Sequence, residues 1–113
     1  MNTLKFGVPC SGIKDKIKDV DIFCTNESEA MAIAAGVTLA GKSPTVYMQN
    51  SGLGNIVDIV SSLYKPYGIP LPKLLLSVRC KPSHHAYMYK ITKKLLTLLE
   101  YYNVEMVEQH EKN

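Results

Sequence analysis

The carboxylate of Glu27 is the side chain whose position in this sequence is best suited to chemistry. It lies in the run Asp21-Ile-Phe-Cys-Thr-Asn-Glu-Ser-Glu-Ala-Met31, where a short apolar strand leads through polar residues into a helix rich in small residues. A carboxylate at such a junction either complements the positive helix N-terminus or works in the crevice beyond the carboxyl end of the strand. Both uses are open for Glu27, whereas Glu29 fits the capping pattern that Asn26 begins.

A second group of candidate residues is the polar turn Gln49-Asn50-Ser51-Gly52-Leu53-Gly54-Asn55, between an expected strand and an expected helix. Two glycines allow the backbone to turn tightly and to approach a ligand closely. Glycine turns are also ordinary connections in α/β proteins, so the turn alone is weak evidence of a site.

The third group lies in the loop from Arg79 to His85. Arg79 and Lys81 could attract an anionic substrate, although solvated loop cations are the commoner case. The pair His84 and His85 could donate or accept protons near neutral pH. The alternative for this pair is an exposed position at the entry of a helix.

Strands and helices that could position these groups alternate along the whole chain. The expected strands cover residues 4–9, 21–25, 44–49, 73–78 and 104–107, and the expected helices cover 12–19, 28–41, 56–64 and 87–102. The alternation predicts one α/β domain over residues 1–113: a three-layer, doubly wound, mainly parallel sheet of about five strands with helices on both faces. Because ligands of such sheets bind beyond the carboxyl ends of the strands, all three groups are expected at one edge.

Two of the expected helices carry more specific predictions. The helix over residues 28–41 is apolar nearly all round, so we expect a second polypeptide to cover part of it, with Ala34 and Ala35 at the contact. In the last helix, apolar positions recur at helical spacing and define its buried face, with lysines on the other face. These apolar positions are Ile91, Leu95, Leu98, Leu99 and Tyr102.

Composition excludes several classes of protein. The formal net charge of +3, from 13 basic and 10 acidic residues, is too small for a nucleic-acid-binding protein. The three cysteines show no Cys-x-x-Cys spacing, so we expect reduced thiols, a cytoplasmic location and no metal site. No run approaches the ~20 apolar residues of a membrane span, and no signal peptide is expected.

Three segments together resemble the pyrimidine-binding domain of thiamine diphosphate-dependent 2-keto acid decarboxylases. They are Gly7-Val8-Pro9-Cys10, Asn26-Glu27-Ser28-Glu29-Ala30 with Ala34-Ala35-Gly36, and Val46-Tyr47-Met48-Gln49-Asn50-Ser51-Gly52-Leu53-Gly54-Asn55. Within that superfamily the sequence is most similar to phosphonopyruvate decarboxylase and to the α subunit of sulfopyruvate decarboxylase. The resemblance runs from about Phe6 to Val107.

The resemblance implies thiamine diphosphate as the cofactor and Glu27 as the acid that bonds its pyrimidine nitrogen. That contact favours the tautomer that removes the thiazolium proton. His84 and His85 are the further catalytic candidates, and Arg79 and Lys81 are the candidates for substrate binding. The residues expected to bind the cofactor with Glu27 are Pro9, Gln49, Asn50, Ser51, Gly52, Leu53, Gly54 and Asn55.

The family holds the diphosphate and magnesium in a second domain that bears a Gly-Asp-Gly stretch, which this sequence does not contain. The resemblance therefore implies a hetero-oligomer in which a separate diphosphate-binding subunit supplies the magnesium ligands. The implied reaction is decarboxylation of 3-phosphonopyruvate or 3-sulfopyruvate to an aldehyde. The alternative is a non-catalytic remnant or regulatory module that kept the fold, because fold alone does not establish function.

Overall fold

A parallel sheet of five strands forms the centre of the computed structural model, which describes residues 4–9, 20–81 and 83–108. The strands are β1 (Lys5–Gly7), β2 (Ile22–Phe23), β3 (Thr45–Gln49), β4 (Lys73–Val78) and β5 (Val104–Glu108). Their order across the sheet is β2-β1-β3-β4-β5, and every neighbouring pair is parallel. The predicted α/β class with a mainly parallel sheet is confirmed.

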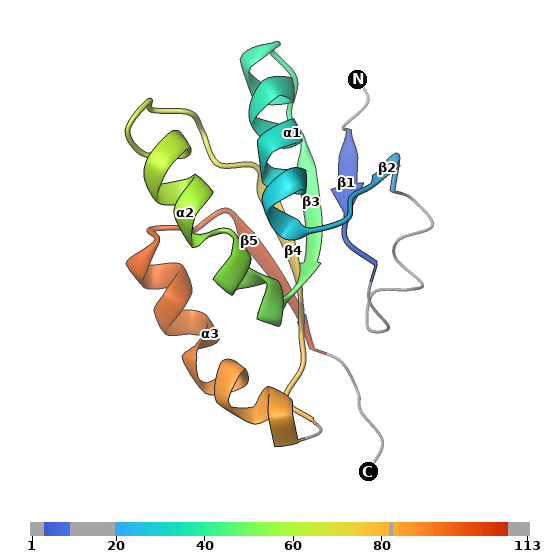
Figure 1. The fold of residues 1–113 in the computed structure, drawn as a ribbon, viewed down its shortest axis with the longest axis vertical. Helices are drawn as coiled ribbons and strands as arrows, with labels where there is room; N and C mark the ends of the chain where they lie inside the picture. The colour runs from blue at the N-terminus through green and yellow to red at the C-terminus, as the bar shows by residue number, and fades with distance from the viewer. Residues whose placement is uncertain (1–3, 10–19, 82, 109–113) are drawn as a thin grey trace.

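The helices described by the structure lie together on one face of this sheet (Figure 1). They are α1 (Glu27–Leu39), α2 (Val57–Ile59), which continues as a π-helical turn over Val60–Tyr64, and α3 (Ala86–Leu98). Two 3₁₀ helices, Asn50–Asn55 and Ser83–His85, precede α2 and α3. The three connections cross the sheet in the same direction, and right-handed crossovers then place their helices on the same face. The helix expected over residues 12–19 lies outside the described residues.

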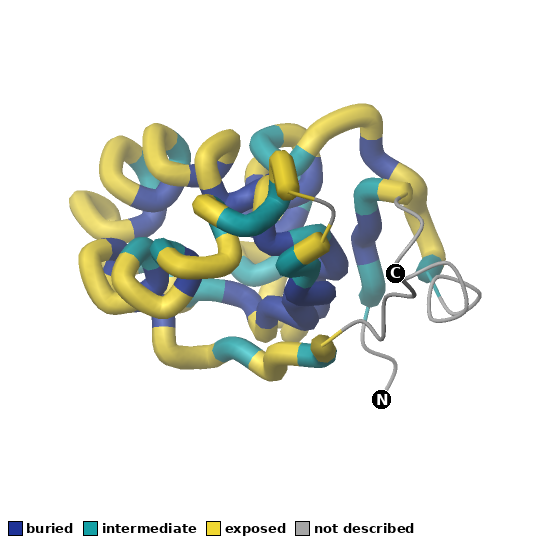
Figure 2. The backbone as a smooth tube through the Cα atoms, turned by 90° about the horizontal axis from the view of Figure 1, so that it is seen from below, coloured by how far each residue is buried: buried dark blue, intermediate teal, exposed yellow. Residues whose placement is uncertain are grey.

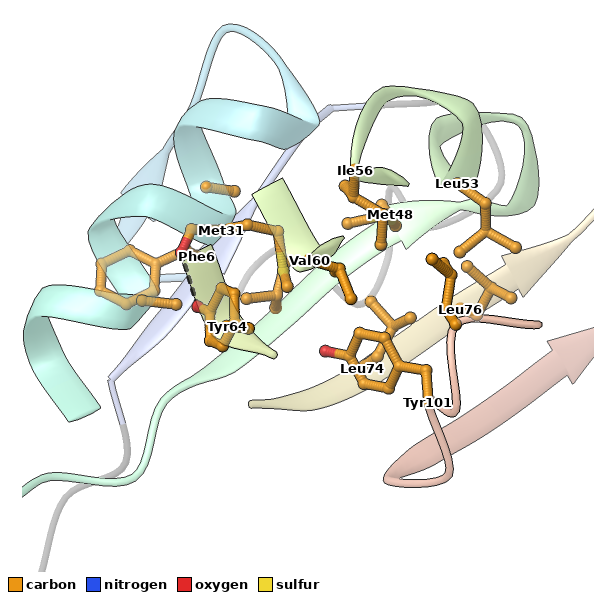
Figure 3. Packing of buried hydrophobic residues seen from close by; sticks show 14 of the residues in the cluster. Phe6, Met31, Met48, Leu53, Ile56, Val60, Tyr64, Leu74, Leu76 and Tyr101 are labelled. Carbon is orange, nitrogen blue, oxygen red and sulfur yellow. Dashed lines mark hydrogen bonds between the residues drawn. The ribbon is translucent and has the colours of Figure 1, made fainter. Parts of the chain in front are cut away.

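Both faces of the central strands are apolar, as expected for buried parallel strands. On the helix side, Val46 and Met48 of β3 and Leu74 and Leu76 of β4 belong to the main core cluster (Figure 3). On the opposite side, Tyr47 of β3 packs with Leu75 of β4, Val20 and Val107. Figure 2 shows these buried segments in the interior, with the exposed turns of the helices outside.

The apolar surface of α1 divides between the core and the outside. Ala34 and Ala35 are 0% and 3% exposed and pack in the core of this chain, together with Ala30 and Met31. The prediction that Ala34 and Ala35 contact another polypeptide is therefore wrong, because the sheet-facing side of the helix already uses them. The exposed positions of the helix and its end other than Glu29 are Ala32, Gly36, Leu39 and Ala40.

The last helix ends earlier than its apolar pattern predicts. Glu100 adopts a left-handed φ of 50°, and the N–H groups of Glu100 and Tyr101 donate to the carbonyls of Thr97 and Leu96. This Schellman arrangement turns the chain inward, so that Tyr101 is 1% exposed. The prediction that Leu98 and Tyr102 are buried is wrong, since they are 79% and 74% exposed.

Tyr64, at the end of the π-helical turn, joins this segment to α1. Its buried phenol donates a hydrogen bond to the backbone carbonyl of Met31, with an O–O distance of 2.6 Å (Figure 3). Burial raises the pKa of the Tyr64 phenol well above its usual value, so the group stays protonated and can donate at neutral pH.

We predict that Tyr64→Phe destabilises the chain by about 1–2 kcal/mol, because it removes a buried donor and keeps the ring. Tyr67→Phe is the matched control, because Tyr67 is 75% exposed; its effect should stay within about 0.5 kcal/mol. Urea unfolding of both variants measures the difference. Equal midpoints for the two variants would contradict the role of this hydrogen bond.

Candidate functional site

The first turn of α1 is held by a capping network in which Glu29 has a structural role. Asn26 is the N-cap residue, with extended backbone angles of −152° and 168°, and its Oδ1 accepts from the N–H of Glu29 at 2.8 Å. The Glu29 carboxylate in turn accepts from the backbone N–H of Thr25 at 3.0 Å and from its hydroxyl at 3.2 Å. The predicted capping pattern is confirmed, and Glu29 is used to hold the junction.

Glu27, the first residue of α1, extends its side chain over the glycine turn that follows β3. A Cβ atom placed on Gly52 would lie 2.5 Å from Cγ, 2.8 Å from Cδ and 3.0 Å from Oε2 of Glu27. Real Cβ atoms do not approach other atoms so closely, so glycine at position 52 is a condition for this placement of Glu27.

Asn55 holds the other side of the same carboxylate. Its Nδ2 donates to Oε1 of Glu27 at 2.7 Å, across 28 residues of sequence. This distance is typical of a hydrogen bond to a charged acceptor. Glu27, Gly52 and Asn55 therefore form one cluster, which joins the start of α1 to the 3₁₀ helix after β3.

The cluster lies where an α/β sheet usually binds ligands. β1 pairs with β2 on one side and with β3 on the other. The order of the strands across the sheet therefore reverses direction at β1. Such a reversal opens a crevice beyond the carboxyl ends of the strands. Glu27 follows β2 and the glycine turn follows β3, as the sequence predicts.

Asn50 holds the glycine turn to the loop after β4. Its Oδ1 accepts from the backbone N–H of Arg79 at 3.0 Å, and its Nδ2 donates to the carbonyl of Arg79 at 3.2 Å and to Oγ1 of Thr92 at 3.1 Å. Asn50 and Thr92 are buried. Both amide hydrogens of Asn50 are thus in use within the fold, which favours a structural role over the predicted contact with a cofactor.

The other predicted cofactor residues divide into two sets. Leu53 is fully buried in the core. Pro9, Ser51 and Gly54 are exposed, and Gln49 is half-buried with its Nε2 donating to Oγ of Ser51 at 3.0 Å. The exposed set can meet a ligand directly, whereas Leu53 can act only by shaping the turn.

The loop after β4 carries the remaining candidates to the same edge of the sheet. Arg79 is half-buried and Lys81 is exposed. His84 is exposed, His85 is half-buried, and the centroids of their rings lie 4.1 Å apart. The contact of Asn50 with the Arg79 backbone fixes where this loop begins relative to the glycine turn.

Cys24, immediately before the junction, is a buried packing residue. Burial, and then the negative charge of Glu29, raise the pKa of the Cys24 thiol. It therefore stays protonated and unreactive at neutral pH. Cys10, which is also expected to be a reduced thiol, lies outside the described residues.

Within residues 4–9, 20–81 and 83–108, no group of three or more His, Cys, Asp and Glu side chains is arranged to hold a metal ion. No helix in the same part of the chain is long and apolar enough to cross a membrane.

The sequence reasoning missed Thr92, the buried partner of Asn50. The signal for it is spacing, because Thr92 lies four and seven residues before the buried Leu96 and Leu99 and so shares their face of the helix. A threonine on a buried face needs a hydrogen-bond partner, and this one donates to the carbonyl of Met88 at 2.6 Å.

No family model matches the sequence. The chain is 43% identical over 70 residues to a sulfopyruvate decarboxylase subunit alpha of Methanocaldococcus jannaschii, covering 56% of this chain and 41% of that protein. It is 35% identical over 103 residues to the same-named subunit of Methanococcus maripaludis, covering 82% of this chain and 62% of that protein. With a phosphonopyruvate decarboxylase of Streptomyces viridochromogenes it shares 36% identity over 106 residues, covering 83% of this chain and 26% of that protein.

These comparisons confirm the resemblance that the motifs predict. The relatives have the two names that the sequence runs indicate, at identities of 35% to 43%. The chain spans about half the length of the α-subunit relatives that it matches, from 41% to 62%.

We predict that Gly52→Ala displaces the Glu27 side chain and changes the free energy of unfolding by less than about 1 kcal/mol, because the atoms that the new Cβ would meet all belong to the flexible side chain of Glu27. Gly54→Ala is the matched control, because a Cβ at Gly54 meets nothing within 4 Å; its effect should stay within about 1 kcal/mol. Thermal unfolding and a crystal structure of each variant provide the test. An unchanged Glu27 conformation in Gly52→Ala would contradict the proposed packing.

Proposed function

We propose that this chain is the pyrimidine-binding subunit of a thiamine diphosphate-dependent 2-keto acid decarboxylase. Its substrate would be 3-phosphonopyruvate or 3-sulfopyruvate, and its products an aldehyde and carbon dioxide. The names of the similar proteins support the reaction and the substrate class. The observation that carries the proposal is the position of the Glu27 carboxylate at the carboxyl edge of the sheet. There it packs against Gly52 and accepts a hydrogen bond from Asn55.

The described residues fit the aminopyrimidine part of this cofactor. A pyrimidine nitrogen needs a carboxyl group that can share a proton, and Glu27 is half-buried at the carboxyl edge of the sheet, with one oxygen already hydrogen-bonded. The neighbouring turn has glycine at position 54, where a Cβ would meet nothing within 4 Å, so a flat ring can approach the backbone at this point. When bound, thiamine diphosphate supplies the nucleophilic carbon and the electron sink that decarboxylation requires.

Each group of the chain has a definite task in this proposal. Glu27 holds the pyrimidine nitrogen and shares a proton with it, and the exposed Ser51 and Gly54 line the ring. His84 and His85 exchange protons with the substrate or product. Arg79 and Lys81 attract the phosphonate or sulfonate group of the substrate.

The diphosphate and magnesium ligands belong, in the same proposal, to a separate subunit. Two of the similar proteins are themselves named as α subunits. We therefore propose that the chain is active only in a hetero-oligomer.

The alternative, a non-catalytic module with the same fold, has one observation in its favour. Asn50 and Leu53 are buried and contribute to folding, so a module without activity would also need them. The Glu27–Asn55 hydrogen bond joins surface groups and is the part of the cluster that such a module would not require.

We predict that Glu27→Gln leaves the fold intact and lowers decarboxylation by the assembled enzyme at least tenfold, a barrier change of at least about 1.4 kcal/mol. The amide has a similar shape and can still accept from Asn55, but it cannot share a proton in the same way. Glu29→Gln is the matched control, because Glu29 lies in the same helical turn and holds the junction. Turnover of Glu27→Gln within tenfold of the original chain would contradict the proposal.

We also predict that the isolated chain binds thiamine diphosphate poorly, because the diphosphate and magnesium ligands are expected on the partner. Calorimetry with magnesium, with and without the partner subunit, measures this. Micromolar affinity for the isolated chain would show that it contains the whole site.

A further inference from the structure

Asn55 differs from the other asparagine of the glycine turn in what its side chain does. Asn50 is buried and bonded to Arg79 and Thr92, whereas Asn55 is exposed and donates to Oε1 of Glu27 at 2.7 Å. The bond of Asn55 joins two segments that the sheet topology brings together, through two side chains that do not belong to the hydrophobic core. Its structural consequence is local: it fixes one oxygen of one carboxylate.

A carboxylate at the end of a glutamate side chain rotates easily, and its two oxygens are chemically equivalent until a contact distinguishes them. At Glu27 two contacts do so. Asn55 engages Oε1, while Gly52 lies under Cγ, Cδ and Oε2 and limits where the side chain can turn. Within residues 4–9, 20–81 and 83–108, the Glu27 carboxylate accepts a hydrogen bond at Oε1, from Asn55. Oε2 is therefore available to bond a ligand.

We infer that Asn55 is a positioning residue for Glu27 and that Oε2 is the oxygen that exchanges the proton with the ligand. This inference rests on the proposed function, and it changes the expected role of Asn55 from direct contact with the cofactor to orientation of the acid. A preorganised group reacts faster than one that must first find its orientation. The gain is expected in turnover and not in substrate affinity.

A double-mutant cycle in the assembled enzyme tests the inference. Asn55→Ala alone should lower kcat about 10-fold to 100-fold and change the KM of the 2-keto acid by less than about 3-fold. In a Glu27→Gln background the same substitution should cause no further loss, because a residue that acts through Glu27 has nothing left to orient. Equal losses in both backgrounds would overturn the inference and make Asn55 an independent contact.

The matched control is Asp58→Ala. Asp58 is exposed and lies one helical turn after Asn55 in the chain. Asp58 accepts a hydrogen bond from Ser62 in its own helical segment. None of the hydrogen bonds among the described residues joins it to Glu27, Gly52 or Asn55. Asp58→Ala should change the kcat of the assembled enzyme by less than about 2-fold relative to the original chain. Loss of kcat in Asp58→Ala equal to that in Asn55→Ala would also count against a specific role for Asn55.

A second readout needs neither partner nor cofactor. In the isolated ¹⁵N-labelled chain, the side-chain amide signals of Asn55 should shift when Glu27 is replaced by alanine. They should remain close to the original positions in Glu27→Gln, whose side-chain oxygen still accepts. Unchanged Asn55 signals in Glu27→Ala would show that the bond is not formed in solution and would overturn the inference.

The outcomes separate this inference from the proposed function. If Glu27→Gln remains fully active, the proposed function fails, whatever the amide signals of Asn55 show. If Glu27→Gln is inactive and Asn55→Ala has full kcat, the proposed function stands and the positioning role is wrong.

Discussion

The close packing of the Glu27 side chain on Gly52 is the constraint that organises the functional edge of this protein. A Cβ at position 52 would lie 2.5 Å from Cγ of Glu27, so the Glu27 side chain occupies this position only because residue 52 has no side chain. The contact places an acid from one connection against the backbone of another. Asn55 then donates a hydrogen bond to Oε1 of the carboxylate in this position.

Pairs of similar residues divide structural and chemical tasks around this contact. Glu29 holds the junction through Thr25, while Glu27, two residues earlier, reaches across to the next connection. Asn50 ties the glycine turn to the loop after β4, while Asn55 orients the acid. Glu29 and Asn50 fix the elements that carry Glu27 and Asn55. A side chain can be preorganised only on elements that are themselves held in place.

Much of the fold could be predicted because local signals agreed with the tertiary structure. β4 was predicted over Lys73–Val78 and has those bounds, since a continuous apolar run with turn residues before it is typical of a buried strand. α1 ends beside Gly41, which takes a φ of 90° and signals the helix end in the sequence. Glu100 has a left-handed φ in the same place after α3, but a glutamate gives no such signal, so the expected helix ran on to Tyr102.

The site was predicted in its position but less well in its contacts. The alternation of strands and helices predicts a parallel sheet whose strands have their carboxyl ends at one edge, and Glu27 and the glycine turn both lie at that edge. The sequence does not indicate whether the side chain of Asn50 or that of Asn55 points into the protein. Their orientation depends on the 3₁₀ helix that carries them and on Thr92 of α3, which bonds Asn50. The core positions of Ala34 and Ala35 were missed for a related reason: a helix that is apolar nearly all round does not indicate which side faces the sheet.

The most direct test of the account is a crystal structure of the assembled enzyme with thiamine diphosphate and magnesium bound. Oε2 of Glu27 should lie within hydrogen-bond distance, about 2.5–3.0 Å, of a pyrimidine ring nitrogen, with Asn55 still bonded to Oε1. A pyrimidine ring bound elsewhere, or a ring nitrogen bonded by a residue other than Glu27, would contradict it.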